Sequence, residues 1–521
     1  MTISEEFWLT YDLTEQELED IYNYLLETET PLDKFEITKF IINNSIKNLT
    51  EKINAEQTAL GIVYLPEKQY SVGDVLTFPV RSNESGTVVS VRPGYNPDYP
   101  DLQVVDVEFR SGNSASFASN LHEHKLNNPV TLLKDDLLDV DYVFDKFGSR
   151  IAEVVADRCS TSNDLVCIAR HYFPRALLFD IGIGHLNLCE AVLEMAGGGP
   201  LSTKELISQV ELPTSNNEIL TEFSLNYALE KDGRFDEVGP SGLVLWFLKR
   251  LEPLEVQKPP LTLTFNGTLP DPSIELEGLT ELNQLVFDEL AEDDSDPSPQ
   301  PEVTMNLSYP HWRAGTLPLT NRVKDIFPTA YETPRVKFAF QDGNNQEKFS
   351  GWVVRSSKYV FGLRDWYEQQ GVIPGSYITI RRGKEPGEVI VLTHKSKNSR
   401  DWIKTVLVGA DGGLVFALLK QVINCTFDER MAIMIPDIEA LDSIWKNPSR
   451  TKQPVDKVVH TIMKEMGKLN LQNQIHAQEL YAAVNVVRRV TTSEILSILY
   501  TQPWAKHLGD LYFKLEETSS T

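Results

Sequence analysis

Apolar residues near the start of the chain recur every three to four positions, which is the spacing of an amphipathic helix. Residues 13–29 and 33–49 both carry such a stripe, with Pro31 between them, so we predict a helical hairpin. From Tyr70 to about Leu126 apolar positions alternate with polar ones, and Gly and Pro separate the runs. We predict four or five short strands there, folded as a small SH3-like β-barrel.

Helical spacing returns after residue 130 and sharpens between 185 and 231, where three helices are predicted in succession. The segment RFDEVGPSGLVLWFL at 234–248 has the pattern of a strand, a tight turn at 239–242 and a second strand. Three helices followed by a two-stranded wing are the order of a winged helix.

A second copy of this pattern occupies residues 458–515. The pair Glu479 and Leu480 parallels Glu205 and Leu206 of the first copy, and both copies end in a turn and a strand. We therefore predict a repeated winged helix. The N-terminal helical hairpin is a candidate third copy, whose wing would be TALGIVYLP at 58–66.

The first copy, at about 185–250, resembles the HARE-type winged helix of the delta subunit of bacterial RNA polymerase and of some chromatin and restriction-linked proteins. In that family a small residue and Glu-Leu open the second helix, and Asp-Gly-Arg-Phe leads into the wing. The matching residues are Thr203, Glu205, Leu206, Asp232, Gly233, Arg234 and Phe235. The copy at about 455–516 keeps Glu-Leu and lacks Asp-Gly-Arg-Phe. The resemblance implies RNA polymerase or another transcription protein as a partner.

Between 308 and 398, strand-like runs surround a short helical segment, and a Pro374-Gly375 turn precedes a strong β-run. This pattern is similar to the DNA-binding pseudobarrel of plant transcription factors and some restriction endonucleases. The resemblance implies that strand and loop residues of this segment enter the major groove of double-stranded DNA.

The net charge of −26 argues against a uniformly nucleic-acid-binding surface. However, residues 1–310 hold 53 acidic against 21 basic residues, whereas residues 311–521 hold 22 against 28. No Lys or Arg lies between 261 and 310, and we predict an acidic linker over 261–307. A solvated spacer is the simpler interpretation of this linker, and a docking peptide or a mimic of nucleic acid is the alternative.

Basic residues interleave with aromatic ones through the pseudobarrel-like segment. Lys and Arg on strands and loops are what phosphate contacts require, although a solvated basic face that balances the acidic half would have the same composition. The candidate nucleic-acid-binding residues are Arg335, Lys337, Arg355, Lys358, Arg364, Arg381, Arg382, Lys384, Lys395, Lys397, Arg400, Arg488, Arg489 and Lys506, and the candidate wing residues are Lys231 and Arg234.

Signatures of catalysis are missing from the sequence. The motif at 122–124 lacks the HExxH spacing of zinc peptidases, and there is no GxSxG elbow, P-loop or dinucleotide fingerprint. We therefore predict that the protein is not an enzyme and needs no cofactor.

Four cysteines are spread along the chain without a CxxC pair, and the Cys and His spacing matches no zinc finger, so we expect no metal site. No apolar run approaches the length of a membrane span, and the first 20 residues are acidic where a secretory signal is basic and then apolar. We expect a cytoplasmic protein without a membrane partner.

Together these patterns predict a multidomain α+β protein with winged helices, a small SH3-like β-barrel and a β-pseudobarrel. The predicted domains are a helical hairpin or degenerate winged helix at 1–66, the small barrel at 67–128, a helical segment plus winged helix at 129–260, the acidic linker at 261–307, the basic pseudobarrel-like domain at 308–405, and a helical segment plus winged helix at 406–521.

We expect the protein to bind double-stranded DNA in transcription or its regulation, with its basic half on the duplex and its acidic half on protein. One alternative is an interaction scaffold or RNA polymerase accessory factor that does not touch DNA. Another is the recognition subunit of a restriction or defence system.

Overall fold

The computed structural model describes most of the chain. The described residues are 5–59, 62–78, 81, 84–110, 112–122, 124–127, 136–210, 212, 217–267, 276–291, 300–330, 333–385, 387–409, 412–447, 449 and 452–516, with backbone only for 53–59 and 395–399. The chain forms two compact units, one of Met1–Phe179 with Ser215–Phe223 and one of Asp180–Thr214 with Ser224–Thr521. Helices and sheets are both abundant, which confirms a multidomain α+β class at the coarse level.

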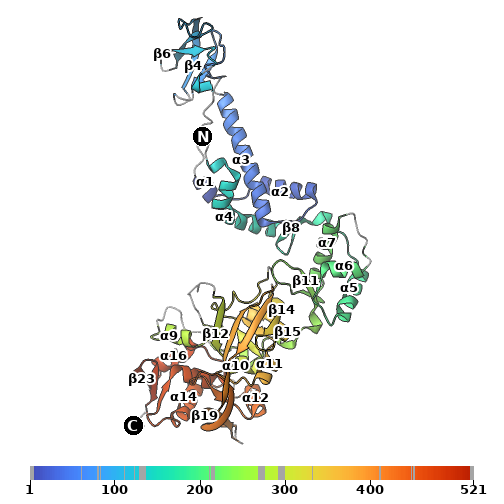
Figure 1. Ribbon diagram of the computed structural model, residues 1–521, viewed down its shortest axis with the longest axis vertical. Coiled ribbons are helices and arrows are strands. Elements are labelled where there is room, and N and C mark those ends of the chain that lie inside the picture. Colours follow the sequence, from blue (N-terminus) through green and yellow to red (C-terminus); the bar gives the residue numbers. More distant parts are fainter. Residues whose placement is uncertain are drawn as a thin grey trace. The chain divides into compact units, whose positions relative to one another are not determined.

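The first unit contains a module of helices and a three-stranded sheet that we call the N-terminal module. It consists of α1 (Glu5–Leu9), α2 (Glu15–Thr28), β1 (Leu32–Asp33), α3 (Lys34–Ala59), α4 (Val140–Thr161), β7 (Leu165–Ile168) and β8 (His171–Pro174), with strand order β1-β8-β7. The predicted helical hairpin is therefore present. Figure 1 shows α4 beside α3, where Val143, Phe147 and Ile151 fill the core against Ile37 and Ile41.

The wing of the N-terminal module is β7 and β8, so the wing expected at 58–66 is wrong. Ile62 and Val63 instead form β2, which pairs in parallel with β3 (Val75–Phe78) of a separate five-stranded sheet. The other strands of that sheet are β4 (Glu84–Pro93), β5 (Gln103–Phe109) and β6 (Ser114–Ser119), in the order β2-β3-β4-β5-β6. This sheet is thus inserted between α3 and α4. The wing was predicted at the wrong place because the inserted sheet separates the helical hairpin of α2 and α3 from α4, β7 and β8, which belong to the same module.

Four of the five strands, β3 to β6, lie in the alternating runs predicted between 70 and 126, and β2 precedes them. Their inner face carries a small aromatic cluster, in which the ring of Phe78 lies 4.3 Å from that of Phe117 and 4.9 Å from that of Tyr64. These rings add large apolar area to a core that also holds Leu76, Val88, Val105 and Val107.

The second module contains the hairpin at 234–248. Its elements are α5 (Ile183–Met195), β9 (Leu201–Ser202), α6 (Thr203–Gln209), α7 (Glu218–Lys231), β10 (Phe235–Glu237) and β11 (Leu245–Leu248), with strand order β10-β11-β9. Ser202 and Glu205 form a capping box at the start of α6. Trp246 is buried, and its Nε1 donates to Asn226 Oδ1 at 2.9 Å.

The C-terminal module repeats the same order. It consists of α14 (Val455–Gly467), β22 (Gln474–His476), α15 (Ala477–Asn485), α16 (Thr492–Thr501), β23 (Ala505–Gly509) and β24 (Tyr512–Leu515), with strand order β22-β24-β23. In all three modules the last strand lies between the other two. Apart from α1 of the N-terminal module, the three modules are therefore alike in element order and strand order.

A seven-stranded sheet fills the segment where a pseudobarrel was expected. Its order is β12-β17-β18-β14-β15-β16-β13, with only β14 and β18 parallel among the pairs described. The elements are β12 (Glu302–Asn306), α10 (Tyr309–Ala314), β13 (Thr316–Pro318), β14 (Arg335–Asp342), β15 (Lys348–Val354), the 3-10 turn η7 (Arg355–Ser357), β16 (Tyr359–Phe361), α11 (Arg364–Gln370), β17 (Tyr377–Arg382) and β18 (Glu388–Thr393). We call this the seven-stranded domain.

A long hairpin follows, formed by β19 (Lys395–Val408) and β20 (Leu414–Cys425), with β21 (Ile433–Met434) added in parallel. The helix α12 (Ile438–Lys446) then leads to the C-terminal module. Shorter pieces, α8 (Leu254–Gln257) and α9 (Leu279–Leu285), join the modules.

The prediction of an acidic linker is wrong for the described part of 261–307, which is folded and packed. Leu282 and Val286 are buried in the same core as α15 and α16, and residues 302–306 form the sheet strand β12. The apolar side chains at 279, 282, 285 and 286 give α9 a helical stripe, which outweighs the acidic composition. Residues 268–275 and 292–299 lie outside the described residues.

The hairpin of the second module docks on the seven-stranded domain, and both belong to the second unit. Phe247 of β11 meets Trp352 of β15 edge to face, with ring centroids 5.2 Å apart. Val238 and Val354 complete this apolar contact. At the turn, the Ser241 amide donates to the Thr329 carbonyl at 2.6 Å. The wing is therefore an internal interface.

Replacing Phe247 by Ala should destabilise the second unit by about 3–5 kcal/mol, because the change leaves a cavity in this interface. The matched control is Leu243→Ala on the same hairpin, where the side chain is 58% exposed. Thermal unfolding with hydrogen exchange of the β14 and β15 amides measures the difference. Equal effects of the two substitutions would contradict the docking.

Candidate nucleic-acid interface

Three segments meet at one end of the seven-stranded domain. They are the loop 319–330 after β13, the turn 355–358 after β15, and the end of β17 with the turn that follows it, described at 382–385 and 387. The Arg382 Nε donates to the Asp325 carbonyl at 2.9 Å and joins the first segment to the third. Residues of the first two segments line one cavity of about 310 Å³. We call these three segments, with Arg381, the basic end.

The exposed cations at the basic end include Lys358, Arg381, Arg382 and Lys384. Lys358 has a left-handed backbone, with φ of 52°, at the tip of its turn. Among the described residues no carboxylate lies within ion-pair distance of its ammonium, and the nearest ion pair of Arg381 is a weak 3.9 Å contact to Glu302. These charges are available to an anionic partner.

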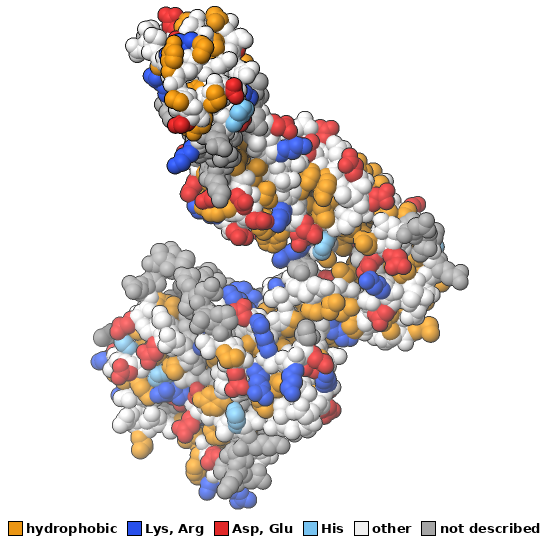
Figure 2. Space-filling model, turned by 45° about the horizontal axis from the view of Figure 1, so that its top comes forward, with side chains coloured by type: hydrophobic (Ala, Val, Ile, Leu, Met, Phe, Trp, Pro, Cys, Tyr) orange, Lys and Arg blue, Asp and Glu red, His pale blue; other side chains and the backbone are white. Residues whose placement is uncertain are grey.

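Acidic side chains at the same end are partly neutralised. Lys348 pairs with Glu388 and lies 3.4 Å from Glu385. The hydrogen bond from Lys348 lowers the pKa of Glu388 below its ordinary value. On the face drawn in Figure 2, Lys and Arg side chains gather over the second unit with Asp and Glu interspersed.

Two of the predicted DNA contacts are instead used inside the protein. Arg335 pairs with Asp236 at 2.8 Å and with Glu252 at 3.2 Å. Lys337 lies 4.4 Å from the ring of Phe247, and burial lowers the pKa of its ammonium. Both residues hold the docked hairpin, so their assignment to DNA is wrong.

Arg489 is also wrongly assigned, because its side chain is only 1% exposed and pairs with Asp288 and Glu289. Glu289 in turn lies 2.8 Å from His311 Nε2. The attraction of Arg489 and His311 outweighs burial and keeps the pKa of Glu289 below its ordinary value. Sequence could not reveal this, since the partners lie about 200 positions apart in the expected linker.

Arg234 of the resemblance motif has a structural role within the second module. Its guanidinium pairs with Asp232 and with Glu190 of α5, and also donates to Asn187. The Asp-Gly-Arg-Phe stretch thus fixes the start of the wing to the first helix. Lys231 remains exposed, with its ammonium 5.5 Å from the ring of Tyr227.

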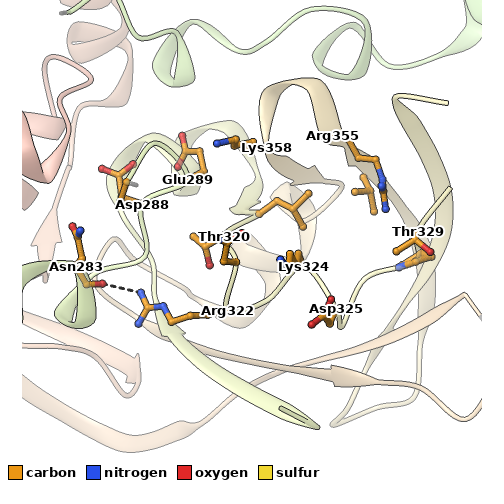
Figure 3. Close-up of a pocket in the computed structure, with 15 residues that line it drawn as sticks. Asn283, Asp288, Glu289, Thr320, Arg322, Lys324, Asp325, Thr329, Arg355 and Lys358 are labelled. Atoms are coloured by element: carbon orange, nitrogen blue, oxygen red, sulfur yellow. Dashed lines mark hydrogen bonds between the residues drawn. The ribbon is translucent and has the colours of Figure 1, made fainter. Parts of the chain in front are cut away.

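The remaining candidates are dispersed. Arg364 is exposed and lies 4.0 Å from Glu255, Arg488 donates to the Gln453 carbonyl, and Lys506 pairs with Glu516 at 3.1 Å. Arg400 is exposed on β19, whereas Lys395 and Lys397 lie outside the described side chains. Arg355 lines the cavity at the basic end. Lys324 also lines this cavity (Figure 3) and was not among the residues predicted from the sequence. The available signal was the position of Lys324 beside Arg322 in the loop between two strands.

The third helix of the C-terminal module, α16, is covered by residues around 277–283, which were predicted to belong to the acidic linker. Thr492 Oγ1 donates to Asn283 Oδ1 at 2.6 Å, and Glu494 is 8% exposed. The Tyr500 hydroxyl donates to the Glu277 carbonyl. In this arrangement α16 cannot enter a major groove.

In the described part of the chain, no three His, Cys, Asp or Glu side chains gather as metal ligands would. Burial raises the pKa of the Cys159 thiol to about 12 and that of Cys189 to about 11, which disfavours the reactive thiolate. Of the helices described, none combines the length and apolar character needed to cross a bilayer.

Comparisons with known proteins gave no match to a family model, a curated protein or a solved structure. The functional inference therefore rests on the residues themselves.

Arg489→Gln should destabilise the protein by about 3–5 kcal/mol, because it leaves Asp288 and Glu289 buried without their cation. Lys506→Gln removes the same charge from an exposed pair and should change stability by less than about 1 kcal/mol. Chemical denaturation measures both. A stable Arg489→Gln variant with weakened DNA binding would restore Arg489 as a DNA contact.

Glu252 gives the docked hairpin a pH dependence. Burial, and then the neighbouring Asp236, raise its pKa from 4.5 to about 8. The folded state therefore holds a proton that the unfolded state releases, so this group's contribution to stability falls as pH rises from about 4.5 to about 8. Glu252→Gln should become more stable than the parent as pH increases from 6 to 9 in thermal melts. Parallel stability curves would contradict this.

Proposed function

We propose that the protein is a non-enzymatic duplex-DNA-binding protein that acts in transcription or its regulation. The observation that carries the proposal is the cluster of exposed cations at the basic end, on loops and turns of the seven-stranded domain. Phosphate contacts require such accessible cations on segments of fixed geometry.

Arg335, Lys337 and Arg489 make contacts inside the protein, so we leave them out of the proposed DNA-binding surface. Of the sequence candidates at the basic end, Lys358, Arg381, Arg382 and Lys384 are exposed, and Arg355 lines the cavity. Four phosphate contacts would give a moderate affinity with a clear dependence on salt. Because the Arg382 guanidinium is held by a carbonyl group, its direction is fixed without loss of its charge.

A second candidate function is contact with RNA polymerase or another transcription protein through the three modules. It is favoured by α16, which is covered, and by the wing of the second module, which is docked. The elements that a winged helix uses on DNA are thus occupied in two copies. Together with the resemblance of 185–250 to the HARE-type domain, this supports the modules as protein-contact elements.

The test is fluorescence anisotropy of the full chain with mixed-sequence duplex at several salt concentrations. A triple variant, Lys358→Gln, Arg381→Gln and Lys384→Gln, should weaken binding and reduce the salt slope by roughly one per lost phosphate contact. The matched control is Lys204→Gln, Lys457→Gln and Lys464→Gln, which makes the same change of charge on exposed lysines of two modules.

The control should bind like the parent. Equal losses in the two triple variants would show that only net charge matters, and would contradict a site at the basic end. Absence of duplex binding by the parent would overturn the proposal and favour the protein-contact function.

A further inference from the structure

The long hairpin of β19 and β20 leaves one strand at the edge of its sheet. The order is β20-β19-β21, so among the described strands β20 has a neighbour on one side only. Within the described chain, the main-chain hydrogen bonds of residues 414–422 run to β19 and to no other segment. The strand meets β17 only after this stretch, where the Tyr377 amide donates to the Thr426 carbonyl. The outer main-chain groups of 414–422 are therefore open to a further strand.

This open stretch lacks the features that protect most edge strands from pairing. Its sequence, LVFALLKQV, holds a single charged residue, Lys420, and no proline. Its pairing with β19 contains no bulge. Natural edges are commonly blocked by charges, prolines or bulges, because an apolar edge pairs readily with another chain. Four apolar side chains of the stretch are 38% to 55% exposed: Leu419, Leu418, Val415 and Val422.

We propose that β20 pairs antiparallel with β20 of a second copy of this chain, about a two-fold axis at Leu418. A strand is complementary to its own copy under such an axis, because each copy offers the other the same donors and acceptors. Pairing along 414–422 gives about nine main-chain hydrogen bonds, close to the roughly ten of a typical protein interface. The two three-stranded sheets then become one continuous sheet.

The side chains and their charges favour this register. Leu418 is the midpoint of the open stretch, so an axis there pairs 414–422 along its full length. Leu414 of one copy then lies opposite Val422 of the other, and the two Leu418 side chains face each other. Lys420 lies opposite Phe416, whereas an axis at Lys420 would bring two ammonium groups together. A second copy therefore supplies an apolar partner strand without a clash of charge.

Sedimentation equilibrium of the full chain tests the proposal. The parent should show twice the 59.0 kDa of one chain. Leu418→Glu and Leu418→Lys should each sediment as single chains, because like charges then face each other across the axis. An equimolar mixture of these two variants should recover the double mass, since unlike charges then face each other. Leu471→Glu, which changes an exposed leucine outside the hairpin, is the matched control and should sediment like the parent.

Circular dichroism of each variant checks that it is folded, and recovery in the mixture shows that both variants keep a competent edge. A parent that sediments as a single chain would overturn the proposal and leave the edge for an extended segment of another protein. A double mass in both Leu418 variants would also overturn it, because the copies would then meet elsewhere. Single chains in the mixture would contradict the axis at Leu418.

Discussion

Phe247 of β11 packs against Trp352 of β15, and the organisation of the second unit follows from this contact. Arg335 and Lys337 both contribute to this docking: Arg335 pairs with Asp236 and lies 3.2 Å from the Glu252 carboxyl group, and Lys337 lies over the Phe247 ring. The same contact removes these two cations from the surface. The basic end is a part of the sheet domain that retains accessible cations, among them Lys358, Arg381 and Lys384.

A second constraint acts on the C-terminal module. Arg489 is buried with Asp288 and Glu289, and it fixes the segment after α9 against α15 and α16. Removing one partner of a buried ion pair strongly destabilises the folded state, because the other charge stays buried without compensation. Two acidic residues of this segment, Asp288 and Glu289, thus make an internal contact, and the same segment covers α16.

Much of the local structure could be predicted from sequence, because apolar spacing sets helices and strands. The stripe of residues 13–49, the alternation between 70 and 126 and the turn at 239–242 all became the elements expected. The insertion between α3 and α4 could not, since β7 and β8 lie about 100 residues beyond the helix hairpin that they complete. Charge alone also could not separate Lys358 from Arg489, because one side chain is exposed and the other is paired across distant segments.

The central claim is that DNA lies on the basic end and away from the third helices of the modules. Hydrogen exchange of the full chain with and without duplex, at low salt, tests it most directly. If duplex DNA binds at the basic end, we expect it to slow the exchange of amides in 319–330, 355–358 and 381–385, with the exchange of α7 and α16 unchanged. Protection of α7 or α16 with no change at the basic end would contradict it.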